Sequence, residues 1–147
     1  MLSLIEGEQN SVAVLANVSA LLNDTLDDLN WVGFYLTQGD ELVLGPFQGR
    51  VACYRIPIGR GVCGSAALSK ETQCIGDVHA FPGHIACDSA SNAELVVPLI
   101  INDNVYGVLD IDSPSLNRFD QHDAKGIELI AENLSSYLAT ACQLSAN

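Results

Sequence analysis

Two acidic residues, Asp110 and Asp112, stand two positions apart in the apolar segment 105–113. Side chains of a strand alternate between its two faces, so residues at i and i+2 share a face. The spacing also fits a solvated sheet face or a strand-end cap, but acids in an otherwise apolar strand are costly unless they are used. The pair is therefore a candidate for holding or protonating a polar ligand.

A third acid, Glu94, begins the preceding apolar segment, and the turn between the two segments decides which face it occupies. A two-residue loop that pairs Asn102 with Val105 puts Glu94 on the opposite face. A three-residue loop that pairs Ile101 with Val105 puts it opposite Asp112 instead. In that register three acids converge, and their repulsion raises at least one pKa, so that a carboxyl group stays protonated and can donate to a substrate oxygen. Both registers stay open.

Five cysteines could supply redox or nucleophilic chemistry. Cys87 lies in the long segment 79–92, which is rich in Gly, Ser, Asp and His, and ordered loops of this length are usually functional. A thiol there can be exposed and reactive. Cys53 stands in a mixed segment that fits either a short strand or a loop. The remaining three fall on apolar-patterned elements and are interpreted as small core residues: Cys63, Cys74 and Cys142.

Other side chains near Cys87 suggest chemistry only weakly. His79 and His84 could indicate zinc, but their spacing does not match paired zinc ligands. With Asp77 they could also indicate a Cys-His nucleophile for acyl transfer, yet no oxyanion-hole motif accompanies them. We therefore expect neither a metal nor a cofactor.

Trp31 and Tyr35, four positions apart in an aromatic segment, share one face of a predicted strand. They fit either plain core packing or one wall of a pocket. A sulfur-bound methyl group would suit such a wall, because alkyl and thioether groups pack well on aromatic rings.

The elements that must position these residues follow from the hydrophobic periodicity, and the 147 residues are of one-domain length. The order of helices and strands predicts an α/β fold of the α+β type, with an antiparallel-rich sheet and the N- and C-terminal helices packed on one face. We expect a single domain, 1–147. The predicted helices are 11–22, with Ser11 as N-cap, 61–71 and a C-terminal one capped by Asp120; the predicted strands are 30–37, 41–47, 72–78, 94–102 and 105–113.

Acidic residues outnumber basic ones by 18 to 6, giving a formal net charge of −12. Such a charge repels phosphate backbones and anionic lipid head groups, so neither nucleic acid nor a membrane is an expected partner. The N-terminus carries acids where a secretory signal carries basic residues, and no apolar run approaches the roughly 18 residues of a membrane span. We expect a cytoplasmic protein, in which a disulfide would be transient and catalytic.

Four segments, NWVGFYL, ACYRIPIGRGVCG, DVHAFPGHIACDSAS and GVLDIDSP, resemble those of the GAF-domain free methionine-(R)-sulfoxide reductases. The similarity extends from about Val14 to Asp123. It implies a GAF domain that reduces free methionine sulfoxide, uses thioredoxin as its reductant and forms a homodimer. The alternative from another class is a GAF module that senses a small ligand without turnover.

The resemblance also implies roles for individual residues. Cys87 would be the catalytic thiol, Cys53 the resolving thiol, and Cys63 a third family cysteine of lesser role. A protonated acid would polarise the S=O bond while the thiolate attacks sulfur, and the resulting sulfenic acid would condense with the second thiol. The residues that match the substrate pocket of the family are the acids Glu94, Asp110 and Asp112 and the aromatic pair Trp31 and Tyr35.

Overall fold

A six-stranded sheet forms the centre of the computed structural model, which describes residues 1–143. Its strand order is β3-β2-β1-β6-β5-β4, and all neighbouring strands in it are antiparallel. The α/β class and the antiparallel-rich sheet agree with the sequence prediction. The expected domain, 1–147, includes residues 144–147, which lie outside the described part. The strands are β1 (Trp31–Gln38), β2 (Glu41–Gly49), β3 (Arg55–Pro57), β4 (Gln73–Ile75), β5 (Ala93–Ile101) and β6 (Asn104–Ser113).

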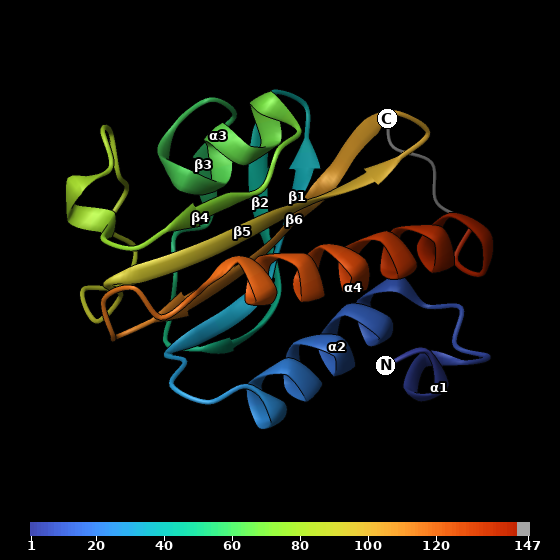
Figure 1. Cartoon of the computed structure of the whole chain (residues 1–147). Helices are drawn as coiled ribbons and strands as arrows, with labels where there is room; N and C mark the ends of the chain where they lie inside the picture. Colours follow the sequence, from blue (N-terminus) through green and yellow to red (C-terminus); the bar gives the residue numbers. More distant parts are fainter. Residues whose placement is uncertain (144–147) are drawn as a thin grey trace.

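Helices cover both faces of the sheet, but unequally (Figure 1). The two long helices, α2 and α4, pack side by side on one face, as predicted for the N- and C-terminal helices, and the short α3 covers the other. Among the described residues, no helix is both long and apolar enough to cross a membrane. The helices are α1 (Leu2–Ile5), α2 (Ser11–Thr25), α3 (Gly61–Ser69) and α4 (Gln121–Thr140), with a 3₁₀ turn, η1 (Val78–Ala80).

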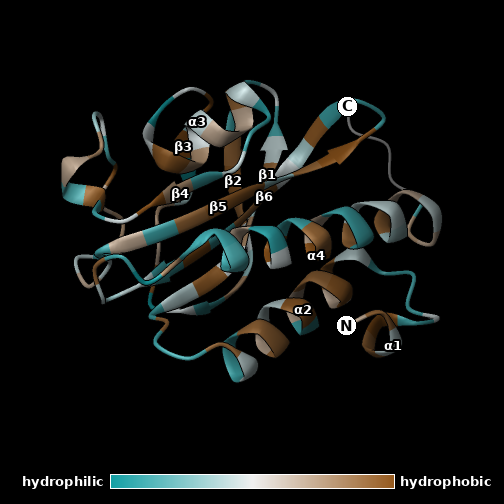
Figure 2. Cartoon of the chain, viewed as in Figure 1, coloured by the Kyte–Doolittle hydropathy of each residue, from teal (hydrophilic) through white to brown (hydrophobic). Residues whose placement is uncertain are grey.

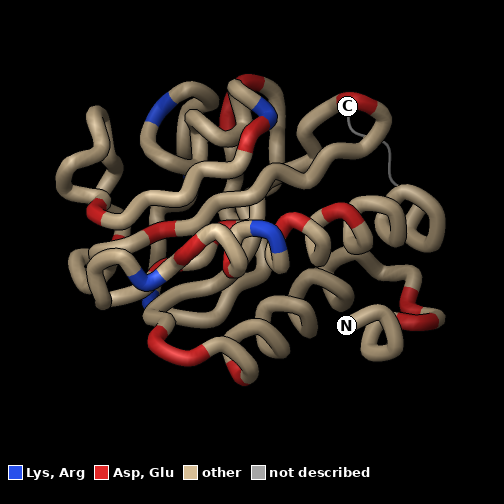
Figure 3. Tube along the Cα trace, in the orientation of Figure 1, with Lys and Arg blue, Asp and Glu red and all other residues tan. Residues whose placement is uncertain are grey.

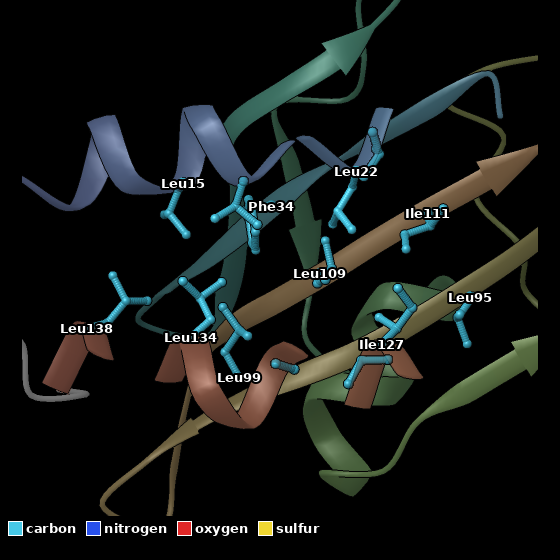
Figure 4. Close-up of a cluster of buried hydrophobic side chains, with 14 of the residues drawn as sticks. Leu15, Leu22, Phe34, Leu95, Leu99, Leu109, Ile111, Ile127, Leu134 and Leu138 are labelled. Carbon is cyan, nitrogen blue, oxygen red and sulfur yellow. The ribbon is translucent and has the colours of Figure 1, made fainter. Parts of the chain in front are cut away.

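The larger apolar core fills the space between the sheet and the pair α2 and α4 (Figure 4). Phe34 of β1, Leu109 of β6 and Leu134 of α4 are completely buried there. Burying one such side chain contributes roughly 1.5–3 kcal/mol. Figure 2 shows α4 with apolar residues on one side and polar residues on the other, as an amphipathic helix on a sheet requires. Polar strand residues that serve a site must therefore point to the α3 face.

The long helices begin at capping residues. Asp120 accepts a hydrogen bond from the backbone N–H of Asp123, whose side chain accepts one from the N–H of Asp120, so the predicted N-cap is a complete capping box. The predicted cap of α2 is wrong by one residue. Asn10 accepts the hydrogen bond from the N–H of Ala13, and Ser11 is the first helical residue.

Short elements were the least predictable from the pattern. The predicted strand 72–78 is only Gln73–Ile75, because η1 follows it, and the predicted strand 41–47 extends to Gly49. The mixed segment after it contains the short strand β3, which pairs with the start of β2. Helix α1 carries too little periodic sequence to be predicted.

Candidate active site

The hairpin of β5 and β6 fixes where the acids point. Its turn residues Asn102 and Asp103 both have positive φ, 51° and 64°, as in the two-residue turns that match strand twist. Ile101 then pairs with Asn104, and a bulge one step further shifts the register, so that Glu94 stands opposite Asp112. Neither predicted loop is present, but the shifted register gives the convergence that the three-residue loop predicted.

The bulge also changes the face that two side chains occupy. Simple alternation along the strand would put Tyr106 on the face of Asp110, yet Tyr106 packs against the larger core and Val105 lies on the α3 side. Beyond the bulge the alternation is regular, so Val108 and Asp110 face α3. The bulge thus puts Glu94 opposite Asp112, and the acids face α3 and not the larger core.

A small cavity of about 40 Å³ opens on the α3 face. Acids, aromatic rings and cysteines border it together, and no Lys or Arg is among its lining residues. The sequence prediction therefore brings its candidates to one place. The predicted residues that line the cavity are Trp31, Tyr35, Cys63, Cys87, Glu94, Asp110 and Asp112. Cys53 adjoins the cavity, since it is bonded to Cys87 and its neighbour Ala52 is in the lining.

The three acids are buried, and no Lys or Arg of the described residues lines their cavity. Glu94, Asp110 and Asp112 are only 7%, 5% and 9% exposed. Burial, and secondly repulsion from Asp112, raises the pKa of Glu94 to about 8. Burial likewise raises the pKa of Asp110 well above its usual range, with repulsion from Glu94 second, and that of Asp112, with repulsion from Asp110 second. Glu94 is therefore mostly protonated at neutral pH.

Two oxygens of the acid cluster are available for hydrogen bonds to a ligand. Oδ1 of Asp110 and Oδ1 of Asp112 are buried and have no hydrogen-bond partner among the described residues. Buried polar atoms are normally satisfied, so such oxygens mark a place where a bound molecule completes the hydrogen bonding.

Cys63 of α3 contacts the acid cluster on the α3 face of the sheet. Its Sγ donates to Oε1 of Glu94 at 3.7 Å, and burial raises its pKa. The thiol is thus held protonated and inert, which agrees with a core role. Its Sγ and carboxylate oxygens of Glu94 and Asp110 lie within 4.8 Å of one another, so these three are the candidates for holding a metal ion among the described residues.

A disulfide joins Cys53 and Cys87, whose Cα atoms are 5.4 Å apart. Cys53 lies in the loop between β2 and β3, and Cys87 in the segment after η1. Both are partly exposed. The bond therefore ties two surface loops together over the cavity.

The aromatic pair supports the loop of Cys53. Nε1–H of Trp31 donates to the carbonyl of Arg50 at 3.2 Å, and the hydroxyl of Tyr35 donates to the carbonyl of Cys53 at 2.9 Å. The two rings are stacked with centroids 5.8 Å apart. Burial raises the pKa of Tyr35, which keeps its hydroxyl a donor. The rings are thus both a wall of the cavity and an anchor for the loop.

The segment 79–92 contributes side chains whose place at the cavity the sequence analysis did not predict. His84 lines the cavity, with Nε2 4.0 Å from Oε2 of Glu94, and burial lowers its pKa. His79 instead bonds Asn92 at 2.9 Å. In the sequence, the two histidines stood out only as weak candidates for zinc binding or for a Cys-His nucleophile.

Two further missed residues are fixed by a hydrogen-bond bridge to the sheet. The side-chain amide of Asn30 donates to Oδ2 of Asp88 at 3.1 Å and to Oγ of Ser91 at 2.9 Å. Asp88 and Ser91 both line the cavity. This bridge holds the segment of Cys87 against the start of β1.

The fold and the location of the cavity define the class of protein. The GAF domain family model matches residues 11–139, so the chain belongs to the GAF-domain proteins.

Known relatives assign the chain to one family within this class. The free methionine-R-sulfoxide reductase of Escherichia coli (strain K12) is 54% identical over 138 residues, which are 94% of this chain and 84% of the relative. The structure of the reduced fRMsr of Staphylococcus aureus is 55% identical with a TM-score of 0.90, over 93% of this chain and 89% of that one. A free methionine-R-sulfoxide reductase from Neisseria meningitidis, solved with its substrate, is 47% identical with a TM-score of 0.92, over 96% and 85%. The chain therefore belongs to the family of free methionine-R-sulfoxide reductases.

Proposed function

We propose that this protein is an oxidoreductase that reduces free L-methionine (R)-sulfoxide to methionine. The observation that carries the proposal is the disulfide between Cys53 and Cys87 beside a cavity lined by three buried acids, of which Glu94 has a pKa raised to about 8. The relatives are named for this activity, and two of the similar structures hold their substrate. A redox-active pair and a proton donor are what reduction of a sulfoxide requires.

In the proposed reaction, Cys87 attacks the sulfoxide sulfur as a thiolate. Glu94 donates its proton to the sulfoxide oxygen, Asp110 helps to polarise the S=O bond in the transition state, and Asp112 holds the polar end of the substrate. The substrate S–O bond then breaks as the oxygen, with the proton from Glu94, is transferred to Sγ of Cys87. The transient bond between Sγ and the substrate sulfur breaks in the same step, so methionine leaves and Cys87 becomes a sulfenic acid. The thiol of Cys53 condenses with that sulfenic acid, which forms the disulfide and releases water.

Recycling of the disulfide needs two electrons from outside. Cys63 is buried against Glu94, and its thiol is held protonated, so it is a poor internal reductant and has at most an auxiliary role. We propose that thioredoxin supplies the electrons, since the exchange of a dithiol for a disulfide balances them.

The rings of Trp31 and Tyr35 would receive the methyl end of the substrate. They are buried, stacked and next to the acids, which suits a ligand that is apolar at one end and polar at the other. We expect selectivity for the free amino acid, because an enclosed site leaves no exit for a peptide chain.

The remaining parts of the proposal are expectations from the sequence, apart from the homodimer, which the family resemblance implies. They are a single GAF domain over residues 1–147, a homodimer, a location in the cytoplasm and no resident cofactor. The net charge of −12 supports the exclusion of nucleic acid and membrane partners.

The decisive experiment measures methionine released from free and peptide-bound sulfoxide, using both sulfur epimers, with thioredoxin as reductant. We expect turnover of the free R epimer and loss of it in Cys87→Ser, whose fold should be unchanged because the substitution is nearly isosteric. A ligand-sensing GAF module would bind without consuming reducing equivalents. Equal turnover in the Cys87→Ser variant would remove the mechanism.

A further inference from the structure

The loop that carries Cys53 has an unusual surface. Val51 and Tyr54 are 89% and 79% exposed, the most exposed large apolar side chains among the described residues. They lie on either side of Cys53 in the sequence, between the arginines Arg50 and Arg55. We call Arg50, Val51, Tyr54 and Arg55 the disulfide rim.

The rim is held rigidly despite its exposure. The carbonyls of Arg50 and Cys53 accept hydrogen bonds from the buried rings of Trp31 and Tyr35, and the carbonyl of Tyr54 accepts one from the N–H of Leu44 at 3.0 Å. With its carbonyls turned to the protein, the loop presents its apolar side chains to solvent in a fixed arrangement. Exposed apolar groups in an ordered segment are typical of interaction surfaces.

The rim also differs in charge from the rest of the protein. The chain has 6 basic residues against 18 acidic ones, and Figure 3 shows how sparse the basic positions are along the trace. Arg50, Arg55 and Arg60 nevertheless all lie within residues 50–60. Arg55 is paired with Glu41 at 2.8 Å, whereas Arg50 has no ion pair among the described residues. An acidic partner would be repelled by the remainder of the surface and attracted to the disulfide rim.

The two sulfurs of the disulfide differ for the same reason. Cys53 lies between Arg50 and Arg55, while Cys87 is followed by Asp88 and adjoins the acid-lined cavity. The reductant attacks as a thiolate, and negative charge spreads over three sulfurs during exchange. A reductant docked on the rim would bring its thiolate beside Arg50, which attracts the incoming charge, and next to Cys53, which the rim residues flank; Cys53 is then the sulfur attacked and Cys87 the leaving group.

We propose that the disulfide rim is the docking surface of the reductant, an acidic dithiol protein of the thioredoxin type, which attacks Sγ of Cys53. This rests on the proposed function, since it concerns the recycling half of that reaction. The reductant thiolate bonds to Cys53, the S–S bond breaks, and the electron pair leaves on Cys87 as a thiolate. The second thiolate of the reductant then attacks the mixed disulfide and frees Cys53, while the reductant becomes a disulfide.

The test measures reduction of the oxidised protein, without methionine sulfoxide, by an acidic thioredoxin and by dithiothreitol. In the double variant Arg50→Glu/Val51→Asp we expect the thioredoxin rate constant to fall about tenfold or more, with little change for dithiothreitol. Added salt should slow the wild type more than the variant. The matched control is Lys125→Glu/Val12→Asp, exposed residues of α4 and α2 on the opposite face, which should leave both rates unchanged. Equal losses in the two double variants, or none in the rim variant, would overturn the docking surface.

The attacked sulfur is identified on the unmodified protein. A thioredoxin that lacks its second active-site thiol should be trapped as a mixed disulfide on Cys53, and mass spectrometry locates it. Trapping on Cys87 would overturn the assignment. A pre-reduced rim variant should still release methionine in one turnover. If the pre-reduced wild type releases none, the proposed function is wrong, whereas the docking result stands independently because it uses no substrate.

Discussion

Glu94 and Asp112 are directly opposed across β5 and β6, a pair of carboxyl groups on neighbouring strands beside a cavity whose lining contains no Lys or Arg. Opposed carboxylates destabilise a sheet when both are ionised. Burial raises the pKa of Glu94 to about 8, and repulsion from Asp112, which protonation relieves, is the second cause. The arrangement keeps a proton on Glu94, next to the place where the oxygen of a substrate would bind.

The first prediction concerns catalysis by these acids. Glu94→Gln and Asp110→Asn should each lower kcat by more than about 10²-fold, the usual scale for losing a positioned acid, with a smaller effect on substrate binding. Steady-state kinetics on free methionine sulfoxide separates the two parameters. Asp103→Asn, an exposed acid in the turn of the same hairpin, is the matched control and should change neither. Losses confined to KM would mean that the proton donor lies elsewhere.

The second prediction concerns stability and pH. The folded protein binds a proton at Glu94 up to about pH 8, whereas the unfolded chain loses it near the ordinary value of 4.5. Stability from this group is therefore full below about pH 4.5 and is lost as the pH rises from there through about 8. Glu94→Gln cannot ionise, so it should be more stable than the wild type at pH 9, by about 1 kcal/mol or more, or about 2–4 °C in Tm.

Thermal unfolding of oxidised protein at pH 5 and pH 9 checks this. The gain should be larger at pH 9 than at pH 5, and Asp103→Asn should show no such difference. A constant offset at both pH values would attribute the effect to packing and not to the proton. A stability gain together with lost turnover would show directly that the acids are kept for function.

The third prediction concerns the two cysteines of the disulfide. Cys53→Ser should complete a first turnover, because Cys87 still attacks sulfur, but multiple turnover with thioredoxin should slow sharply. Cys63→Ser should keep multiple turnover, because Cys53 and Cys87 remain and their Cα atoms are already 5.4 Å apart. Mass spectrometry of the non-reduced, substrate-treated wild type should find the Cys53–Cys87 bond. A dominant Cys63–Cys87 bond would reverse the roles of Cys53 and Cys63.

The fourth prediction concerns the oxidised state. With the disulfide closed, the cavity has only about 40 Å³, far below the roughly 300 Å³ and more of typical small-molecule sites. Oxidised protein should therefore bind methionine sulfoxide at least about tenfold more weakly than reduced Cys87→Ser, which can bind but not react. Calorimetry on the two proteins is the measurement. Equal affinities would show that reduction does not open the site.

Periodic patterns of apolar residues made much of the fold predictable. The apolar stripe of α4 with its Asp120 cap, and the two apolar strands that became β5 and β6, carry strong local patterns. The short strand β3 carries no such pattern, because it is three residues long and exists through its pairing with β2. Its existence depends on the folded sheet, so the sequence pattern alone could not show it.

The candidate site, like the fold, was predictable only in part. Alternation along β6 correctly put Asp110 and Asp112 on one face, but the position of Glu94 depended on a bulge that a loop-length argument does not contain. The contributions of Asp88, Ser91 and His84 arise from an irregular segment, where no periodicity relates sequence to direction. Only the completed bridge from Asn30 shows why that segment lies where it does.

The hydrogen bond from Trp31 to the carbonyl of Arg50 also gives the protein an optical reporter. Trp31 is the only tryptophan of the chain, and its indole N–H is engaged by the loop that carries Cys53. Indole emission shifts with the polarity around the ring, and a nearby disulfide quenches it. Because no second tryptophan contributes background, the emission of the unmodified protein would follow the making and breaking of one sulfur–sulfur bond in real time.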